Sequence, residues 1–192
     1  IDNPQNYLTT NSPKIILYQG VINPSRGLDQ IISAMNIIED AQLWIAGDGP
    51  KRKELEFLTK TLGLEQKVKF LGKLLPKDLR EITKKADVGL SIEENNGLSY
   101  YYSMPNKVSD YIQARIPVIV SDFPEMRKVV DRFQKKKKIE DHAQLAEKIE
   151  IVLKNGKLFY KDSLNKAASE LCWENEEYKI LNLFKQVVAE NS

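Results

Sequence analysis

The sequence is nearly free of cysteine and histidine, with Cys172 and His142 as single copies among 192 residues. An internal disulfide is therefore excluded, and the isolated cysteine fits a reducing compartment. Zinc sites take clusters of these residues, so we expect no metal, and the sequence predicts no cofactor. A single histidine in a polar stretch also argues against a Ser–His–acid triad.

Long apolar runs and a strong net charge are missing as well. No run approaches the ~20 apolar residues that span a bilayer. Residues 1–13 are polar and contain Pro4, which indicates a linker rather than a signal peptide. The formal net charge of +2 is too small to predict a nucleic-acid partner. The basic run Lys135–Lys138 is interpreted as a solvated loop, with contact to anionic lipid head groups as the alternative.

The sequence does contain a regular alternation of short apolar runs and helical patterns. Five runs predict strands, namely Lys14–Gln19, Gln42–Ala46, Val68–Leu71, Asp87–Ile92 and Pro117–Ser121. A helical pattern separates each pair, as in βαβ units. We therefore predict an α/β fold, a Rossmann-like doubly wound parallel sheet with a helical C-terminal tail. Its ligand-binding domain would cover residues 14–171, followed by a C-terminal helix over 172–192.

One loop at the predicted ligand-binding edge is unusually long. Right-handed crossovers place the carboxyl ends of parallel strands at one edge of the sheet, where ligands bind in such folds. The loop Glu93–Lys107 leaves this edge and far exceeds the usual ~4–6 residues. We expect it to be polar and irregular as far as Met104, with a helix opening at Pro105. The ligand site is therefore predicted in this loop.

Two segments at the same edge combine a helix start with a cation. Arg26 closes the glycine-bounded loop Gly20–Gly27, and Lys107 follows the turn Ser103–Asn106. Helix N-termini and arginine both favour phosphate. Asp110 is expected on the same side as Lys107 by its i, i+3 spacing, so a nucleoside diphosphate would suit the pair. The alternatives are a plain connecting loop with a surface arginine, and a surface ion pair between Lys107 and Asp110.

Two other nucleotide motifs are incomplete or absent. The segment Gly47–Pro50 follows a strand and opens a helix, like part of a dinucleotide fingerprint. Its third glycine position is Arg52, so a nicotinamide site is not favoured. There is no GxxxxGK[ST] sequence, which argues against a Walker-type ATPase.

The segments YQG, RGLDQIISAM, WIAGDGP, VKFLG, ADVGLS and PNKVSDYIQARIPVIVSD follow one another over about residues 14–130. In order and spacing this series resembles the C-terminal domain of GT-B glycosyltransferases of the retaining group 1 or family 4 type. The resemblance implies a nucleotide-sugar-binding domain, an N-terminal Rossmann-like domain outside this chain, and a helix over 172–192 that packs back toward it. It also implies sugar transfer from a nucleotide diphosphate sugar to a glycan or lipid-linked acceptor, with retention and without an essential metal.

The family's donor contacts can be carried over to matching positions. In the family, a glycine and a basic residue of the first loop contact the donor diphosphate, and Gly20 and Arg26 match them. Val21 stands where the family often has a further arginine, so one phosphate contact is replaced or lost. Backbone around the VKFLG segment meets the nucleotide base, which places the base near Gly72–Leu74.

The family's hallmark is a pair of glutamates, and this sequence departs from it. Their positions are Tyr102 and Asp110, so the first acid is missing and the second is shorter. Lys107, in a PNK motif found in a subgroup, is interpreted as replacing lost phosphate contacts, and Arg115 stands where glycine is usual. The resemblance implies that Arg26 and Lys107 are catalytic through the leaving diphosphate. The expected donor-binding residues are Gly20, Arg26, Gly47, Gly72, Lys73, Ser103, Pro105, Asn106, Lys107 and Asp110.

The predicted role is therefore in cell-surface polysaccharide or lipopolysaccharide synthesis. The expected location is the cytoplasm, with peripheral contact to the inner face of the membrane as a further hypothesis. Two alternatives stay open at this point. A nucleotide-sugar 2-epimerase has the same two-domain architecture. A receiver-like signalling domain shares the five-stranded sheet, but it predicts paired acids after the first strand, where this sequence has Gln19 and Gly20.

Overall fold

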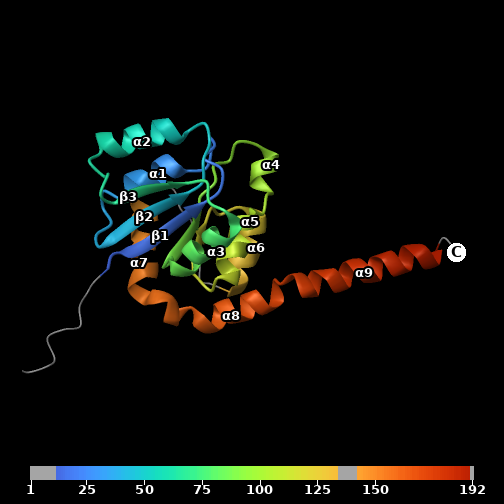
Figure 1. Cartoon of the computed structure of the whole chain (residues 1–192). Coiled ribbons are helices and arrows are strands. Elements are labelled where there is room, and N and C mark those ends of the chain that lie inside the picture. Colours follow the sequence, from blue (N-terminus) through green and yellow to red (C-terminus); the bar gives the residue numbers. More distant parts are fainter. Residues whose placement is uncertain (1–11, 134–141, 191–192) are drawn as a thin grey trace, which may run out of the picture.

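The computed structural model describes residues 12–133 and 142–190, and a parallel five-stranded sheet forms its centre (Figure 1). The strand order is β3-β2-β1-β4-β5. The strands are β1 Lys14–Gln19, β2 Ala41–Ala46, β3 Val68–Gly72, β4 Val88–Ser91 and β5 Val118–Val120. The five predicted strands are thus confirmed to within one residue at each end. Most of the predicted linker, 1–13, and the lysine run 135–138 lie outside the described residues.

Helices cover both faces of the sheet (Figure 1). They are α1 Leu28–Ala34, α2 Arg52–Thr61, α3 Pro76–Lys85, α4 Leu98–Tyr101, α5 Asn106–Gln113, α6 Pro124–Phe133, α7 His142–Phe159, α8 Lys161–Glu170 and α9 Trp173–Glu190. Successive residues of β1 face opposite layers. Ile16 and Tyr18 belong to a core with α1, α2 and α7, while Leu17 belongs to a core with α3, α5, α6 and α8. The Rossmann-like doubly wound fold and the helical C-terminal region are therefore confirmed.

Two segments differ from the prediction. Residues expected as irregular loop contain the one-turn helix α4, which begins after Gly97 and is too short to show an apolar period in the sequence. The helix expected near 157–171 is divided between α7 and α8. Gly156 has a φ of 70° inside α7, a conformation that interrupts a right-handed helix and that glycine adopts without strain.

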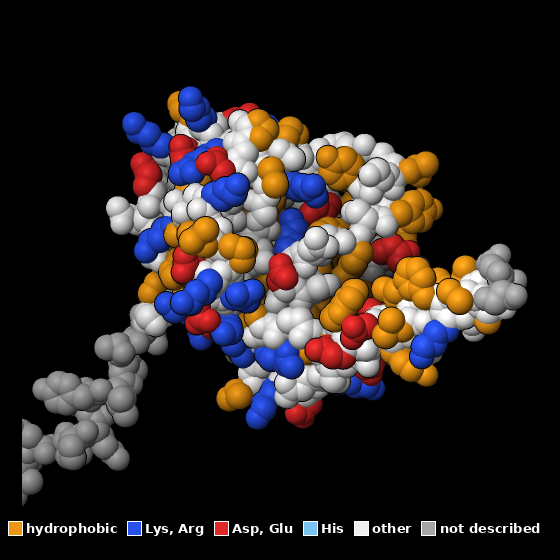
Figure 2. Space-filling model, turned by 45° about the vertical axis from the view of Figure 1, so that its right-hand side comes forward, with side chains coloured by type: hydrophobic (Ala, Val, Ile, Leu, Met, Phe, Trp, Pro, Cys, Tyr) orange, Lys and Arg blue, Asp and Glu red, His pale blue; other side chains and the backbone are white. Residues whose placement is uncertain are grey.

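The helix α9 leaves the domain and projects away from it (Figure 1). Large apolar side chains stay exposed along it, and many are visible on the face drawn in Figure 2. Trp173, Ile180 and Phe184 share one side of the helix by their spacing. In the ranges that the structure describes, no helix is long and apolar enough to cross a membrane.

Arg115 holds a strained backbone position immediately after α5, with a φ of 60°. This left-handed conformation costs a non-glycine residue roughly 1–2 kcal/mol. Two exposed hydrogen bonds offset part of that cost, from Arg115 Nε to Asn165 Oδ1 at 3.1 Å and from Arg115 Nη1 to the Gln113 carbonyl at 2.6 Å. Arg115→Gly and Arg115→Ala both lose these bonds, but only the glycine variant relieves the strain, so its free energy of unfolding should be about 1 kcal/mol higher than that of Arg115→Ala in urea titrations. Equal stability of the two variants would contradict this account.

Candidate functional site

The site lies at the carboxyl ends of the adjacent parallel strands β1 and β4. At this point the chain continues from β1 to one side of the sheet and from β4 to the other. The buried hydroxyl of Tyr111, on α5, contacts the backbone of both strands. It accepts a hydrogen bond from the Gln19 amide at 3.0 Å and donates toward the carbonyls of Leu17 and Leu90. Burial raises the pKa of Tyr111 well above its usual value, so the hydroxyl keeps its proton. A side chain at Gly89 would meet the Tyr111 ring at 2.5 Å, which explains a glycine inside β4.

Three glycines bring the ends of β1, β2 and β3 close together. The Gly47 amide donates to the Gly72 carbonyl at 2.8 Å, and the Gly20 amide donates to the Ala46 carbonyl at 3.0 Å. A Cβ on Gly47 would lie 1.8 Å from the Gly20 carbonyl oxygen. Gly47 thus permits close packing of two loops.

A pocket of about 510 Å³ opens between the β1–α1 loop and the start of α5. Its lining contains six of the ten predicted donor-binding residues, namely Gly20, Arg26, Ser103, Pro105, Asn106 and Lys107. Gly47, Gly72 and Lys73 lie outside this lining. The structure therefore brings the two predicted cations into one cavity, although they are far apart in the sequence.

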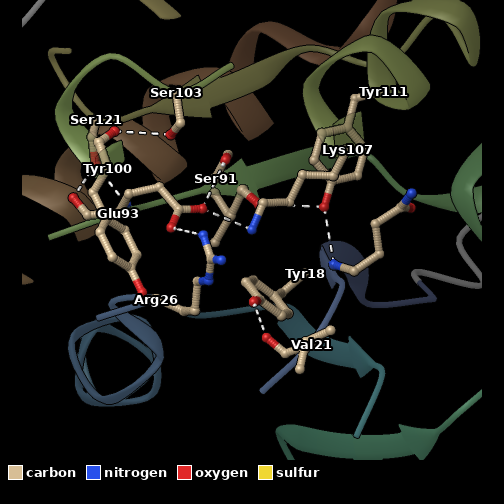
Figure 3. A network of polar contacts seen from close by, with 12 residues as sticks. Tyr18, Val21, Arg26, Ser91, Glu93, Tyr100, Ser103, Lys107, Tyr111 and Ser121 are labelled. Atoms are coloured by element: carbon tan, nitrogen blue, oxygen red, sulfur yellow. Dashed lines mark hydrogen bonds and ion pairs between the residues drawn. The ribbon is translucent and has the colours of Figure 1, made fainter. Parts of the chain in front are cut away.

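A buried carboxylate joins these two cations. Glu93 follows β4, its side chain is 0% exposed, and Figure 3 shows it between the head groups of Arg26 and Lys107. Its Oε2 accepts a hydrogen bond from Arg26, and its Oε1 lies 3.0 Å from the Lys107 ammonium. Ser121 holds the Glu93 backbone, accepting from its amide and donating to its carbonyl, each at 2.7 Å. Glu93 was predicted only as the start of the loop, because nothing local in the sequence marks its side chain as buried.

The combined effects of burial and the Glu93 carboxylate shift the pKa values of the two cations in opposite directions. Burial lowers the pKa of Lys107, and the nearby Glu93 carboxylate opposes that shift. Burial also acts to lower the pKa of Arg26, but its hydrogen bond and charge contact with Glu93 outweigh this and raise it. The Lys107 ammonium also lies over the Tyr18 ring, 4.4 Å from its centre. The contacts with Glu93 and Tyr18 hold the two cationic head groups in place in the pocket wall.

Asp110 does not share the pocket of Lys107, contrary to the i, i+3 prediction. It lines a second pocket of about 300 Å³, together with Leu79 and Thr83 of α3. Gln19 lines both pockets. Its amide nitrogen donates to Asp110 Oδ2 at 2.9 Å, and its oxygen accepts from the Thr83 hydroxyl at 2.8 Å. Lys107 pairs instead with Glu93, so the surface ion pair between Lys107 and Asp110 is excluded.

The aromatic residues of the loop divide between pocket and surface. Tyr100 lines the first pocket, and the Arg26 guanidinium lies 5.4 Å from the centre of its ring. Tyr102, at the position of the family's first acid, is 57% exposed and packs edge-on against Tyr101. The sequence analysis singled out Tyr102 and missed Tyr100, because the direction of each side chain depends on the one-turn helix α4. Within the described ranges, no group of three His, Cys, Asp or Glu residues gathers to hold a metal ion.

Solved structures share this fold. Sucrose-phosphate synthase from Thermosynechococcus elongatus has a TM-score of 0.81 at 20% identity, over 95% of this chain and 47% of that one. Anabaena Alr3699/HepE, in complex with UDP, has a TM-score of 0.79 at 15% identity, over 91% of this chain and 49% of that one. These likenesses show the architecture, and this chain corresponds to about half of each protein.

Sequence comparison identifies the family. The lipopolysaccharide core biosynthesis glycosyltransferase LpsD of Rhizobium meliloti (strain 1021) is 38% identical over 30% of this chain and 17% of its own length. The uncharacterized glycosyltransferase MJ1607 of Methanocaldococcus jannaschii is 34% identical over 61% of this chain and 29% of its own length. The model of the glycosyl transferases group 1 matches residues 2–170. A receiver-like domain is thereby excluded, and the chain belongs to the group 1 glycosyl transferases.

Proposed function

We propose that this chain is the donor-binding domain of a retaining enzyme that transfers a sugar from a nucleotide diphosphate sugar to a glycan or lipid-linked acceptor. Arg26 and Lys107 carry the proposal, because both cations line one pocket at the carboxyl ends of β1 and β4. Cations and helix N-termini at this edge of an α/β sheet are the usual partners of phosphate. The likeness to a lipopolysaccharide core transferase supports a role in cell-surface glycan synthesis.

The two pockets that share Gln19 suggest how the donor lies. The diphosphate occupies the first pocket, where Arg26 and Lys107 reach its oxygens. The nucleoside extends past Gln19 toward the second pocket, where the Asp110 carboxylate accepts hydrogen bonds from ribose hydroxyls. The base then lies toward Gly72–Leu74. Anabaena Alr3699/HepE, which has the same fold, was solved in complex with UDP, and this supports a nucleotide as the ligand of this chain.

The chemistry expected of this domain is electrostatic. Cleavage of the bond between the sugar and the diphosphate leaves negative charge on the departing phosphate oxygens. Two preorganised cations in a partly buried pocket stabilise that charge without a metal ion. Tyr100, stacked near Arg26, bounds the sugar side of the pocket. Arg26 and Lys107 are accordingly the proposed catalytic residues of this half of the enzyme.

The other half of the active site would come from a second domain. This chain spans 47% and 49% of the two solved structures compared above. An acceptor-binding domain would close over the pocket, and α9 would pack against that domain with the apolar side chains it now exposes. Burial of such a helix face is the ordinary fate of an amphipathic helix.

Calorimetry with nucleoside diphosphates tests the proposal. We expect one of the uridine, guanosine and adenosine diphosphates to bind this chain at micromolar to millimolar concentration. Arg26→Ala should weaken that binding by about tenfold or more, since it removes a charge-assisted phosphate contact. Lys60→Ala is the control for loss of a surface cation, because Lys60 is exposed on α2 and lines neither pocket. Absence of binding by all three nucleotides would refute the proposed function.

A further inference from the structure

Glu93 has no contact with the donor in the proposed arrangement. It lines neither pocket, and its fully buried carboxylate lies between the head groups of Arg26 and Lys107 (Figure 3). The Ser91 hydroxyl lies 3.5 Å from Glu93 Oε1, on the side away from Arg26. Desolvation of a carboxylate is costly, and two donors of opposite charge offset that cost. The group thus occupies a position at the centre of the site without touching the ligand.

The first consequence is a change in the charge of the pocket wall. Arg26 and Lys107 supply two positive charges and Glu93 supplies one negative charge, so the cluster carries one net positive charge. A neutral residue at this position would leave up to two, since Glu93 also acts to raise the pKa of the buried Lys107. Lys107 is 9% exposed and Arg26 is 25% exposed, so solvent screens this cluster less than it screens a surface ion pair.

The second consequence concerns the difference between substrate and product. In a nucleotide sugar, each phosphate is esterified to carbon and joined to the other phosphate through an anhydride oxygen. Each therefore carries one negative charge, which gives two in total. The released nucleoside diphosphate has a terminal phosphate that ionises again near pH ~6, which gives it about three charges at higher pH. Attraction grows with the product of the two charges, so a more positive pocket retains the product more strongly.

We propose that Glu93 limits the charge of the diphosphate pocket so that the enzyme does not hold its nucleoside diphosphate product too tightly. The inference rests on the proposed function, because it takes the pocket as the diphosphate site. Glu93 acts through Arg26 and Lys107 and is a positioning residue rather than a catalytic one. Product release commonly limits turnover, so such a device has a direct effect on rate.

The test uses two ligands that differ in one charge and carry no sugar. These are the nucleoside diphosphate that binds most tightly and its methyl ester on the terminal phosphate, compared by calorimetry at pH ~8. In the wild-type protein we expect the diphosphate to bind at most about tenfold more tightly than the ester. In Glu93→Gln this preference should be about ten times the wild-type value, because the additional negative charge of the diphosphate then meets a more positive pocket. Glu93→Asp keeps the charge and should restore the wild-type preference.

Glu94→Gln provides the matched control, because this neighbouring acid is partly exposed and lines neither pocket. Its preference should equal that of wild type. A preference in Glu93→Gln within about twofold of the wild-type value would overturn the inference, and weaker binding of both ligands in parallel would show a purely structural role. If Glu93→Gln does not fold, a wild-type preference above about a hundredfold overturns it instead. Failure of both ligands to bind the wild-type protein would refute the proposed function, not the charge argument.

Discussion

Replacement of Lys107 by methionine is expected to lower kcat/KM of the full-length enzyme by about 10²–10³-fold, the usual loss when one preorganised group for developing negative charge is removed. Lys107 lines the pocket proposed for the diphosphate, and no other ammonium belongs to the described lining. Steady-state kinetics with a saturating acceptor measure the loss. Lys60→Met is the matched control, because Lys60 is exposed on α2 and lies outside the pocket. Its kcat/KM should equal that of wild type.

The same substitution also affects stability, and a second variant separates the two effects. Without Lys107, the buried Glu93 carboxylate keeps Arg26 as its charged partner and loses the ammonium at 3.0 Å. Loss of one partner of a buried pair costs about 3–5 kcal/mol. The double variant Lys107→Met with Glu93→Gln removes both charges, so it should recover most of the free energy of unfolding while kcat/KM stays low. Recovery of kcat/KM together with stability would mean that Lys107 serves folding alone.

Gly47→Ala is expected to lower the free energy of unfolding by more than about 4 kcal/mol, which is exceptional for one methyl group. The added Cβ would lie 1.8 Å from the Gly20 carbonyl oxygen, so backbone on both sides has to move. Gly47 also has a φ of 154°, which side chains rarely adopt. Because Gly20 lines the diphosphate pocket, the displacement should weaken nucleotide binding as well.

Gly63→Ala distinguishes backbone strain from collision. Gly63 has a φ of 68°, and nothing lies within 4 Å of a Cβ built on it. This variant should therefore lose only the left-handed strain, about 1–2 kcal/mol. Urea unfolding of both variants gives the comparison. If Gly47→Ala costs no more than Gly63→Ala, the close contact between the β1 and β2 loops does not constrain the fold.

The sheet and most of its helices could be predicted because their signals are local. An apolar run such as Lys14–Gln19 needs both faces covered, and its hydrophobicity is legible without knowledge of its neighbours. Right-handed connections place the carboxyl ends of the strands at one edge, but they do not fix the strand order, which the structure gives as β3-β2-β1-β4-β5. The single turn α4 and the break at Gly156 were missed, because one turn has no period and a glycine near a helix end has several conformations available.

The site could be predicted only in part. Arg26 and Lys107 could be chosen as candidates because a cation beside a helix start at a strand end is a pattern within a few residues, and both line one pocket. Glu93 and Tyr100 were missed, since one is defined by its burial and the other by the direction of a one-turn helix. The expectation that Asp110 and Lys107 face the same pocket was wrong, because tertiary packing gives each side chain a different partner. That partner is Glu93 for Lys107 and Gln19 for Asp110.

By itself, the sequence determined the doubly wound sheet, the edge at which the candidate site was predicted and the two cations proposed to bind the diphosphate, because periodicity and residue type act over short distances. Tertiary structure decided how these parts meet. Parallel pairing of β1 with β4 brought Arg26 and Lys107, 81 positions apart in the chain, onto one pocket wall. It also buried Glu93 between them, where its carboxylate balances part of their positive charge.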